Sequence, residues 1–149
     1  MRAALAAAGV VTDIVELPGA AHSAQLAADY IGCNVAQMAN SLVFRAATSD
    51  SALLVMSSGA RRVNTRKLAA LIGEPVGKAD AAFVRRHTGF AIGGVAPAGH
   101  AATVRAFVET SLAAYQELWA AAGHPQTLFR LSYGDLLRVT RGVEAELAE

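Results

Sequence analysis

A glycine-dense segment that ends in a histidine is the part of this sequence best suited to chemistry. Residues 91–100 contain three glycines and one proline and end at His100. Glycine lets main-chain amides approach a ligand closely, and proline fixes part of a loop's shape. His100 could act as a general base, because its ordinary pKa lies near neutrality. The same residue types are also typical of a simple turn, so the segment alone leaves both interpretations open.

The single cysteine and the four histidines predict neither a disulfide nor a metal site. Cys33 has no partner for an internal disulfide, which fits a reducing compartment. It follows Gly32 at an expected helix end, with no charged neighbour closer than Asp29, so we interpret it as a small buried apolar residue rather than a catalytic thiol. The histidines lie at no spacing typical of zinc ligands. We expect no metal and no organic cofactor.

Positive charge is concentrated in one stretch, although the formal net charge of the chain is only +1. Residues 57–90 contain seven Lys and Arg residues and two acidic residues. Clustered Lys and Arg gain affinity for phosphates by releasing counterions, so this stretch favours a polyanionic partner. A solvated basic surface is the alternative. The sequence has no helix-turn-helix or aromatic-basic pattern, and we expect no DNA binding.

The length of 149 residues suits a single domain over residues 1–149, long enough to bury about two thirds of the surface of its unfolded chain. The longest apolar stretch, residues 3–11, is far shorter than the roughly 20 residues of a membrane span. We interpret residues 3–9 as a short helix rather than a signal peptide, because Asp13 and Glu16 follow at once. We therefore expect a cytoplasmic protein without membrane contact.

Capping residues and apolar periodicity predict the elements that would position the loop. Three helices are expected over residues 24–31, 65–72 and 133–140, with Ser23, Asn64 and Ser132 as N-caps. Extended segments are expected over residues 41–46, 52–56, 104–108, 112–121 and 127–131, the first two forming a β-hairpin. Residues 112–121 also satisfy a helical pattern, which periodicity cannot settle. This mixture predicts an α+β or α/β domain around one sheet.

An ordered set of motifs now points to a family. The sequence reads Ser-Leu-Val-Phe-Arg at residues 41–45, Ser-Gly-Ala-Arg-Arg-Val-Asn at 58–64, and Gly-Phe-Ala-Ile-Gly-Gly-Val-Ala-Pro-Ala-Gly-His at 89–100. Further matching segments are residues 16–18, 23–32, 67–69, 109–112, 119–123 and 129–132. Together they cover nearly the whole chain and resemble the YbaK/ProX family of aminoacyl-tRNA deacylases, which includes the editing domain associated with prolyl-tRNA synthetase.

The resemblance implies a fold and an activity. The fold is α+β, with a curved, mixed, mostly antiparallel sheet flanked by helices, and it assigns a strand to residues 115–122 after a short turn at 111–113. Family members hydrolyse the ester that joins a wrong amino acid to tRNA. We expect a free-standing, trans-editing deacylase for a small amino acid, without a cofactor. Its expected partners are aminoacyl-tRNA and an aminoacyl-tRNA synthetase.

The resemblance also implies site residues. The element that runs from Gly93 to Pro97 would shape the amino-acid pocket, and the amides of Gly93 and Gly94 would stabilise the developing oxyanion. Because the family relies on a positioned water and the terminal hydroxyl of the tRNA, we expect His100 to hold the loop or the terminal adenosine rather than act as a base. The residues expected to bind substrate are Phe44, Ser58, Gly59, Pro97, Ala98, Gly99 and His100. For Ser58 and Gly59, a simple turn is the alternative.

One position departs from the family pattern. Members typically carry a lysine at the start of the strand where this chain has Asn40. An amide still donates hydrogen bonds but lacks charge, so a charge-assisted contact of about 1.5–3 kcal/mol is weakened. Arg45 or one of the basic residues within 57–66 would compensate, and we expect Arg45, Arg61 and Arg62 to bind the tRNA. We place Asn40 with the catalytic residues; the alternative is a weak or inactive member that binds tRNA or a synthetase without hydrolysis.

Overall fold

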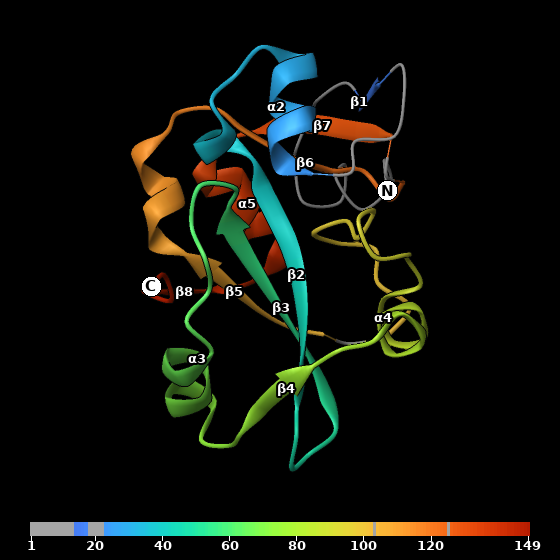
Figure 1. The fold of residues 1–149 in the computed structure, drawn as a ribbon, viewed down its shortest axis with the longest axis vertical. Coiled ribbons are helices and arrows are strands. Elements are labelled where there is room, and N and C mark those ends of the chain that lie inside the picture. Colours follow the sequence, from blue (N-terminus) through green and yellow to red (C-terminus); the bar gives the residue numbers. More distant parts are fainter. Residues whose placement is uncertain (1–13, 18–22, 103, 125) are drawn as a thin grey trace.

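Two β-sheets enclose the main hydrophobic core of this protein. The computed structural model describes residues 14–17, 23–102, 104–124 and 126–149 (Figure 1). The main core combines residues of both sheets, such as Leu54, Met56 and Phe129, with residues of two helices. A second cluster, with Leu53 and Leu68, covers the other face of the larger sheet. That sheet is therefore covered on both faces.

The larger sheet has five strands in the order β4-β2-β3-β5-β8. Its strands are β2 (Ala39–Ala46), β3 (Ser51–Ser58), β4 (Val76–Lys78), β5 (Arg105–Glu109) and β8 (Val143–Ala145). The β4-β2-β3 part is antiparallel, whereas β3, β5 and β8 run parallel. The smaller sheet is antiparallel, in the order β1-β7-β6, with β1 (Ile14–Glu16), β6 (Leu118–Ala121) and β7 (Thr127–Leu131). The expected mixed, mostly antiparallel α+β fold is confirmed, but the strands form two sheets instead of the one sheet that was expected.

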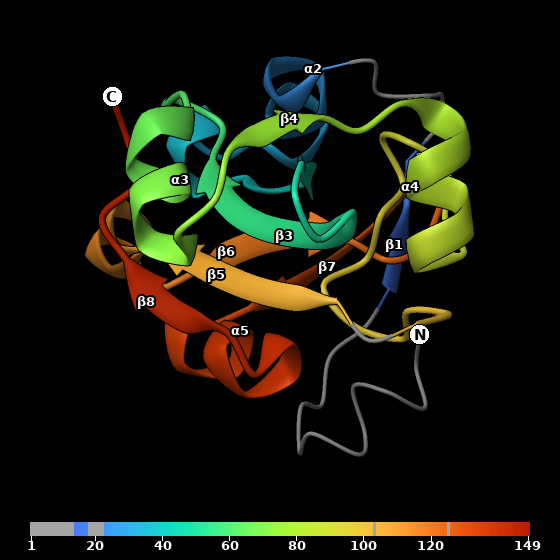
Figure 2. The ribbon, with the colours of Figure 1, turned by 90° about the horizontal axis from the view of Figure 1, so that it is seen from below.

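The three predicted helices are confirmed with their predicted bounds: α2 (Ala24–Ile31), α3 (Thr65–Ile72) and α5 (Tyr133–Thr140). Each begins at the expected cap, because the side chains of Ser23, Asn64 and Ser132 accept hydrogen bonds from main-chain N–H groups of the first turn. Figures 1 and 2 show α3 and α4 (Ala81–Thr88) on opposite sides of β4. No described helix combines the length and apolar character of a transmembrane span.

Other elements differ from expectation or were not expected. The strand predicted over residues 115–122 is shorter, since β6 begins only at Leu118, after the 3-10 helix η2 (Thr110–Ala114). Helix α4, the 3-10 helix η1 (Val35–Gln37) and strands β1, β4 and β8 were not predicted from the sequence. The helix expected over residues 3–9 lies outside the described residues.

Candidate functional site

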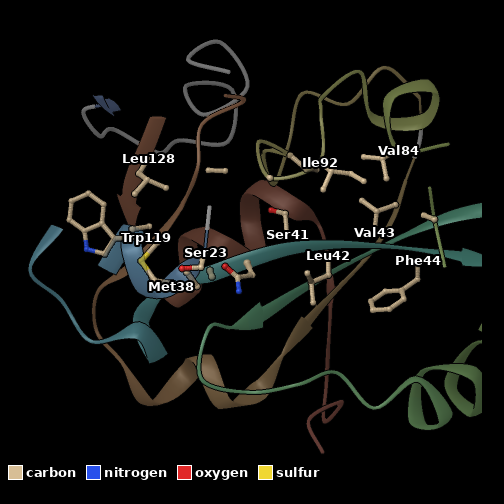
Figure 3. Close-up of a pocket in the computed structure, with 18 residues that line it drawn as sticks. Ser23, Met38, Ser41, Leu42, Val43, Phe44, Val84, Ile92, Trp119 and Leu128 are labelled. Atoms are coloured by element: carbon tan, nitrogen blue, oxygen red, sulfur yellow. The ribbon is translucent and has the colours of Figure 1, made fainter. Parts of the chain in front are cut away.

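A cavity of about 440 Å³ lies along one edge of β2 (Figure 3). It is bounded by α2, by β6 and β7 of the smaller sheet, and by α4 with the loop that follows it. The described residues that line it are Ser23, Ala24, Ala27, Met38, Ala39, Asn40, Ser41, Leu42, Val43, Phe44, Ala79, Val84, Ile92, Gly93, Val95, Trp119, Ala121 and Leu128. All of these residues are uncharged. A cavity of this size holds a small ligand or one end of a large one.

The edge of β2 that faces the cavity has no strand partner over its middle, within the described part of the chain. On this edge β4 pairs only with residues 44–46, and Met38 forms a single bridge to Trp119 of β6. Seven consecutive residues, 38–44, line the cavity. Because side chains alternate between the two faces of a strand, such a run shows that the cavity follows the strand edge rather than one face.

Main-chain hydrogen bonds identify the residues that point their N–H and C=O groups toward this edge. Ala47 N donates to Pro75 O at 2.8 Å, on the β4 side. On the β3 side, Ala46 O accepts from Asp50 N and Met38 O accepts from Gly59 N, both at 2.8 Å. Main-chain groups alternate between the two edges of a strand. The odd-numbered residues of β2 therefore point outward, and Ser41 lies midway along the unpaired part.

Side chains of β2 divide the cavity lining into two parts. Figure 3 shows Ser41 and Val43 extending toward Ile92 and Val84, while Leu42 and Phe44 extend to the other side of the strand. The Ser41 hydroxyl donates to Met56 Sδ at 3.3 Å, in the main core. The loop side of the cavity is thus mostly apolar.

Asn40 belongs to the other face of β2. It pairs with Ser57 of β3, and directly paired residues project from the same face of a sheet. Ser57 is 1% exposed, and its hydroxyl has no hydrogen-bond partner among the described residues. Asn40 is half-buried and lines the cavity. Asn40, at the position where the resemblance leads us to expect a lysine, therefore borders the cavity and is paired with a residue whose hydroxyl has no described partner.

Of the three glycines in the glycine loop, Gly93 lines the cavity. It has a φ of 88°, a conformation that favours glycine. Gly94 N donates to Ala91 O at 3.0 Å, which closes a turn. Of the two amides expected to face an oxyanion, the Gly94 amide is engaged in this turn, whereas the Gly93 N–H donates to none of the described residues.

The last residues of the glycine loop, 97–100, support the shape of the loop and do not line the cavity. His100 Nε2 lies 2.7 Å from Ala96 O, so it carries the hydrogen and donates to that carbonyl. Burial lowers the pKa of His100, although the hydrogen bond to Ala96 opposes the shift, and the imidazole is neutral near pH 7. Pro97 is buried, Ala98 packs against the main core, and Gly99 has a φ of 78°.

Ser58 and Gly59 position α2 and η1 and are not among the residues that line the cavity. The Ser58 hydroxyl donates to Ala36 O at 2.8 Å. A Cβ atom at Gly59 would lie 2.6 Å from Val35 O and 2.9 Å from the Cβ of Ala24. Since Ala24 lines the cavity, this close packing holds one side of the cavity in place.

The arginines expected to bind tRNA lie on two separate surfaces. Arg45 pairs with Asp50 at 2.5 Å, and its guanidinium lies 5.4 Å from the centre of the Phe83 ring of α4. Arg86 of α4 lies over the same ring. Arg61 and Arg62 are exposed in the segment between β3 and α3, where Arg62 O accepts from Glu149 N.

Several cavity residues were missed from the sequence. Met38, Ser41 and Trp119 carried no motif that marks a ligand site, and the Nε1 atom of Trp119 is buried without a described partner. Cys33 does not line the cavity and is half-buried instead of fully buried as expected; it packs against an apolar cluster, burial raises its thiol pKa, and Sγ lies 3.9 Å from Met38 Sδ. No cluster of metal-binding side chains occurs in the ranges that the structure describes.

Comparison with known proteins identifies the family. The aminoacyl-tRNA editing domain matches residues 18–139. A crystal structure described as a candidate trans-editing enzyme for prolyl tRNA synthetase is 39% identical, with a TM-score of 0.93 over 99% of this chain and 94% of that chain. A second solved structure, of a hypothetical protein, is 22% identical with a TM-score of 0.91 over 99% and 98% of the two chains, and shows the fold alone.

A sequence relative is also known. The uncharacterised protein YwhH of Bacillus subtilis is 27% identical over 124 residues, which cover 83% of this chain and 78% of that protein. The resemblance inferred from the motifs is confirmed by the domain match, which spans most of the chain including β2 and the glycine loop. This chain belongs to the family of aminoacyl-tRNA editing domains.

Proposed function

We propose that this chain is a free-standing deacylase that hydrolyses the ester of a tRNA carrying a small, wrong amino acid. One observation carries the proposal: an uncharged cavity of about 440 Å³ is bounded by the Gly93 loop and by the free edge of β2, meaning the edge of residues 39–43 that pairs with no strand in the described part of the chain. The cavity is large enough for an aminoacyl group and far too small for the tRNA, which would remain outside. Similarity to the candidate trans-editing enzyme supports the same reaction and favours proline tRNA as the carrier.

Hydrolysis here would rest on main-chain groups and water. A water oxygen adds to the ester carbonyl carbon, and the bond from that carbon to the terminal ribose oxygen breaks. The ribose oxygen takes a proton, and the free amino acid leaves. No described residue that lines the cavity is an acid, a histidine, a lysine or a cysteine, so the neighbouring hydroxyl of the ribose is the group best placed to orient the water. The Gly93 N–H would stabilise the oxyanion, a contribution of about 2.7–4 kcal/mol for such a donor.

Substrate size follows from the apolar lining. Val43, Val84 and Ile92 surround the loop side of the cavity. The synthetic site of a synthetase distinguishes two amino acids that differ by one methylene group by only about 1–3 kcal/mol, so tRNAs that carry a small wrong amino acid must be hydrolysed at a second site. A panel of proline tRNAs carrying alanine, serine, cysteine or threonine tests this directly. We expect rapid ester loss for at least one of them, with prolyl-tRNA left intact.

Asn40 supports a second candidate function, a protein that binds tRNA or a synthetase without hydrolysis. It lacks the charge of the family's usual lysine, and no charged residue among the described lining takes its place. Ester loss no faster than in buffer for every member of the panel, with tRNA binding retained, would establish this candidate and reject the deacylase.

We also propose that the protein acts in the cytoplasm and meets a prolyl-tRNA synthetase there. The proposal rests on the similar protein described as editing for that synthetase. Co-elution of the two purified proteins with tRNA in gel filtration tests the contact, and separate elution under conditions where each binds tRNA would reject it.

A further inference from the structure

We propose that the free edge of β2 at Ser41 binds the aminoacyl group through main-chain hydrogen bonds, as a neighbouring strand residue would. In this arrangement the substrate α-ammonium donates to Ser41 O, and Ser41 N–H donates to the ester carbonyl. The inference rests on the proposed function, because it names the part of the cavity that holds the reacting group.

The charge of the substrate requires hydrogen-bond acceptors in the cavity. An aminoacyl ester carries a positively charged α-ammonium group, and burying it without acceptors is costly. No carboxylate lines the cavity among the described residues, so neutral oxygens must accept its hydrogen bonds. The Ser23 hydroxyl already accepts from Leu26 N, and the Ser41 hydroxyl is directed at Met56 Sδ. The amide oxygen of Asn40 belongs to the other face of β2, so the outward carbonyls of β2 are the aligned acceptors that remain.

The main chain of Ser41 is oriented as in a strand residue that awaits a neighbour. Ser41 points both its N–H and its C=O toward the cavity, midway between the bridge at Met38 and the first residue that β4 pairs, Phe44. Two residues directly opposite each other in a hydrogen-bonded antiparallel pair exchange both of their N–H···O bonds. An aminoacyl ester in an extended conformation offers the same donor and acceptor as such a residue. The free edge can therefore form hydrogen bonds with the α-ammonium and the ester carbonyl of the substrate at the same time.

Pairing with Ser41 also determines where the substrate side chain lies. A residue paired with Ser41 projects its side chain from the same face as Ser41. On that face Figure 3 shows Val43, Val84 and Ile92. A small apolar side chain would pack there, and the ester carbonyl would keep its hydrogen bond from Ser41 N–H as it becomes an oxyanion. Ser41 N–H thus acts with Gly93 N–H on the reacting carbonyl.

The decisive variant is Ser41→Pro, compared with Ser41→Ala. Proline is tolerated on edge strands where the N–H faces away from the sheet, so the variant removes this donor and spares the pairing with β3. Ser41→Ala removes the same hydroxyl and keeps the N–H. Because both variants lack the hydroxyl and only Ser41→Pro lacks the N–H, we expect Ser41→Pro, folded by circular dichroism, to deacylate about 100-fold or more slowly than Ser41→Ala. Equal rates for the two variants would overturn the proposal.

A second measurement on the wild-type chain covers the case in which Ser41→Pro does not fold. Adenosine carrying alanine through a hydrolysis-resistant 3′-amide is compared with the same compound carrying lactate, which replaces the ammonium with a hydroxyl. Calorimetry should show binding of the alanyl compound at least tenfold tighter. Equal affinity would show that the ammonium is not recognised and would overturn the proposal.

These experiments separate the two proposals. Deacylation that is insensitive to Ser41→Pro and to loss of the ammonium rejects the edge site and leaves the proposed function intact. Absence of deacylation, with the alanyl compound bound tightly by wild type, rejects the function and supports the edge site. An extended peptide that displaces the alanyl compound and perturbs the amide resonances of residues 39–43 would assign the edge to a protein partner and overturn the proposal.

Discussion

Asn40 on β2 lies directly opposite Ser57 on β3, and the hydroxyl of Ser57 is buried with no hydrogen-bond partner among the described residues. Buried polar groups are usually satisfied, and an unsatisfied one costs about 1–3 kcal/mol. The pair lies at the cavity end of the β2-β3 hairpin, where the resemblance to the editing family leads us to expect a lysine. Asn40 is therefore the position at which a substitution most directly tests that expectation.

Replacing Asn40 with lysine should raise the rate of deacylation. A lysine there restores a charged donor at the edge of the cavity, and a charge-assisted contact of about 1.5–3 kcal/mol corresponds to roughly 10- to 150-fold in rate. Single-turnover hydrolysis of the preferred misacylated tRNA measures the effect. Asn40→Met is the matched control, because it has similar length without charge and should not exceed wild type. A lysine variant no faster than wild type would show that Asn40 does not limit the reaction.

Gly59→Ala should destabilise the fold, although glycine at this position was expected to contact substrate. The added Cβ would lie 2.6 Å from Val35 O, so η1 and α2 must move. Overpacking of this kind costs about 1–3 kcal/mol, measured as the free energy of unfolding in urea. Gly77→Ala is the control, since its Cβ meets nothing within 4 Å and should leave stability equal or slightly higher. Equal stability of the two variants would contradict the close packing.

The helices were predictable from the sequence because their ends carry local signals. Ser23 and Gly32 bracket α2 in the structure as they do in the sequence. Helix α4 has the same kinds of signal, with Asp80 as N-cap and Gly89 after its last turn. It was missed because its basic residues were interpreted only as a charged surface. The residues at the two ends of α4 therefore predict this helix as well as Ser23 and Gly32 predict α2.

The cavity was not predictable in the same way, because it depends on pairing between distant segments. Its open edge exists because β4 pairs with only residues 44–46 of β2, and because β6 reaches β2 only at Met38. Neither limit is visible in the residues of β2 itself. Family resemblance placed Asn40, Phe44 and Gly93 at the site, and these line the cavity, while Pro97 and His100 of the same loop do not.

His100 should affect stability at low pH and have little effect on catalysis. Burial lowers its pKa in the folded state below the ordinary value near 6.5, so the unfolded chain binds more protons as the pH falls. The stability contributed by neutral His100 is present above pH 6.5 and is lost as the pH falls toward the folded-state pKa. His100→Gln keeps a donor for Ala96 O without titrating, so urea unfolding should show a smaller loss between pH 7 and 5.

The same variant tests the role of His100 in hydrolysis. If the imidazole only supports the loop, His100→Gln should deacylate within about fivefold of wild type at pH 7.5. A general base contributes typically 10²–10⁴-fold. A loss of that size, with unchanged stability, would contradict the supporting role and assign the base to His100.

Arg61 and Arg62 should contribute to tRNA binding through charge alone. Both are exposed beside α3, and removing one arginine that binds a phosphate should lower the slope of log affinity against log salt by about one. We expect the double variant Arg61→Ala, Arg62→Ala to bind tRNA more weakly at low salt and with a shallower slope. Arg130→Ala with Arg138→Ala is the control, because it removes the same charge from residues paired with Glu117 and Asp135. An identical slope for wild type and the Arg61, Arg62 variant would show that these arginines do not contact tRNA. The alternative tRNA-binding surface would then be Arg45 and Arg86 beside Phe83.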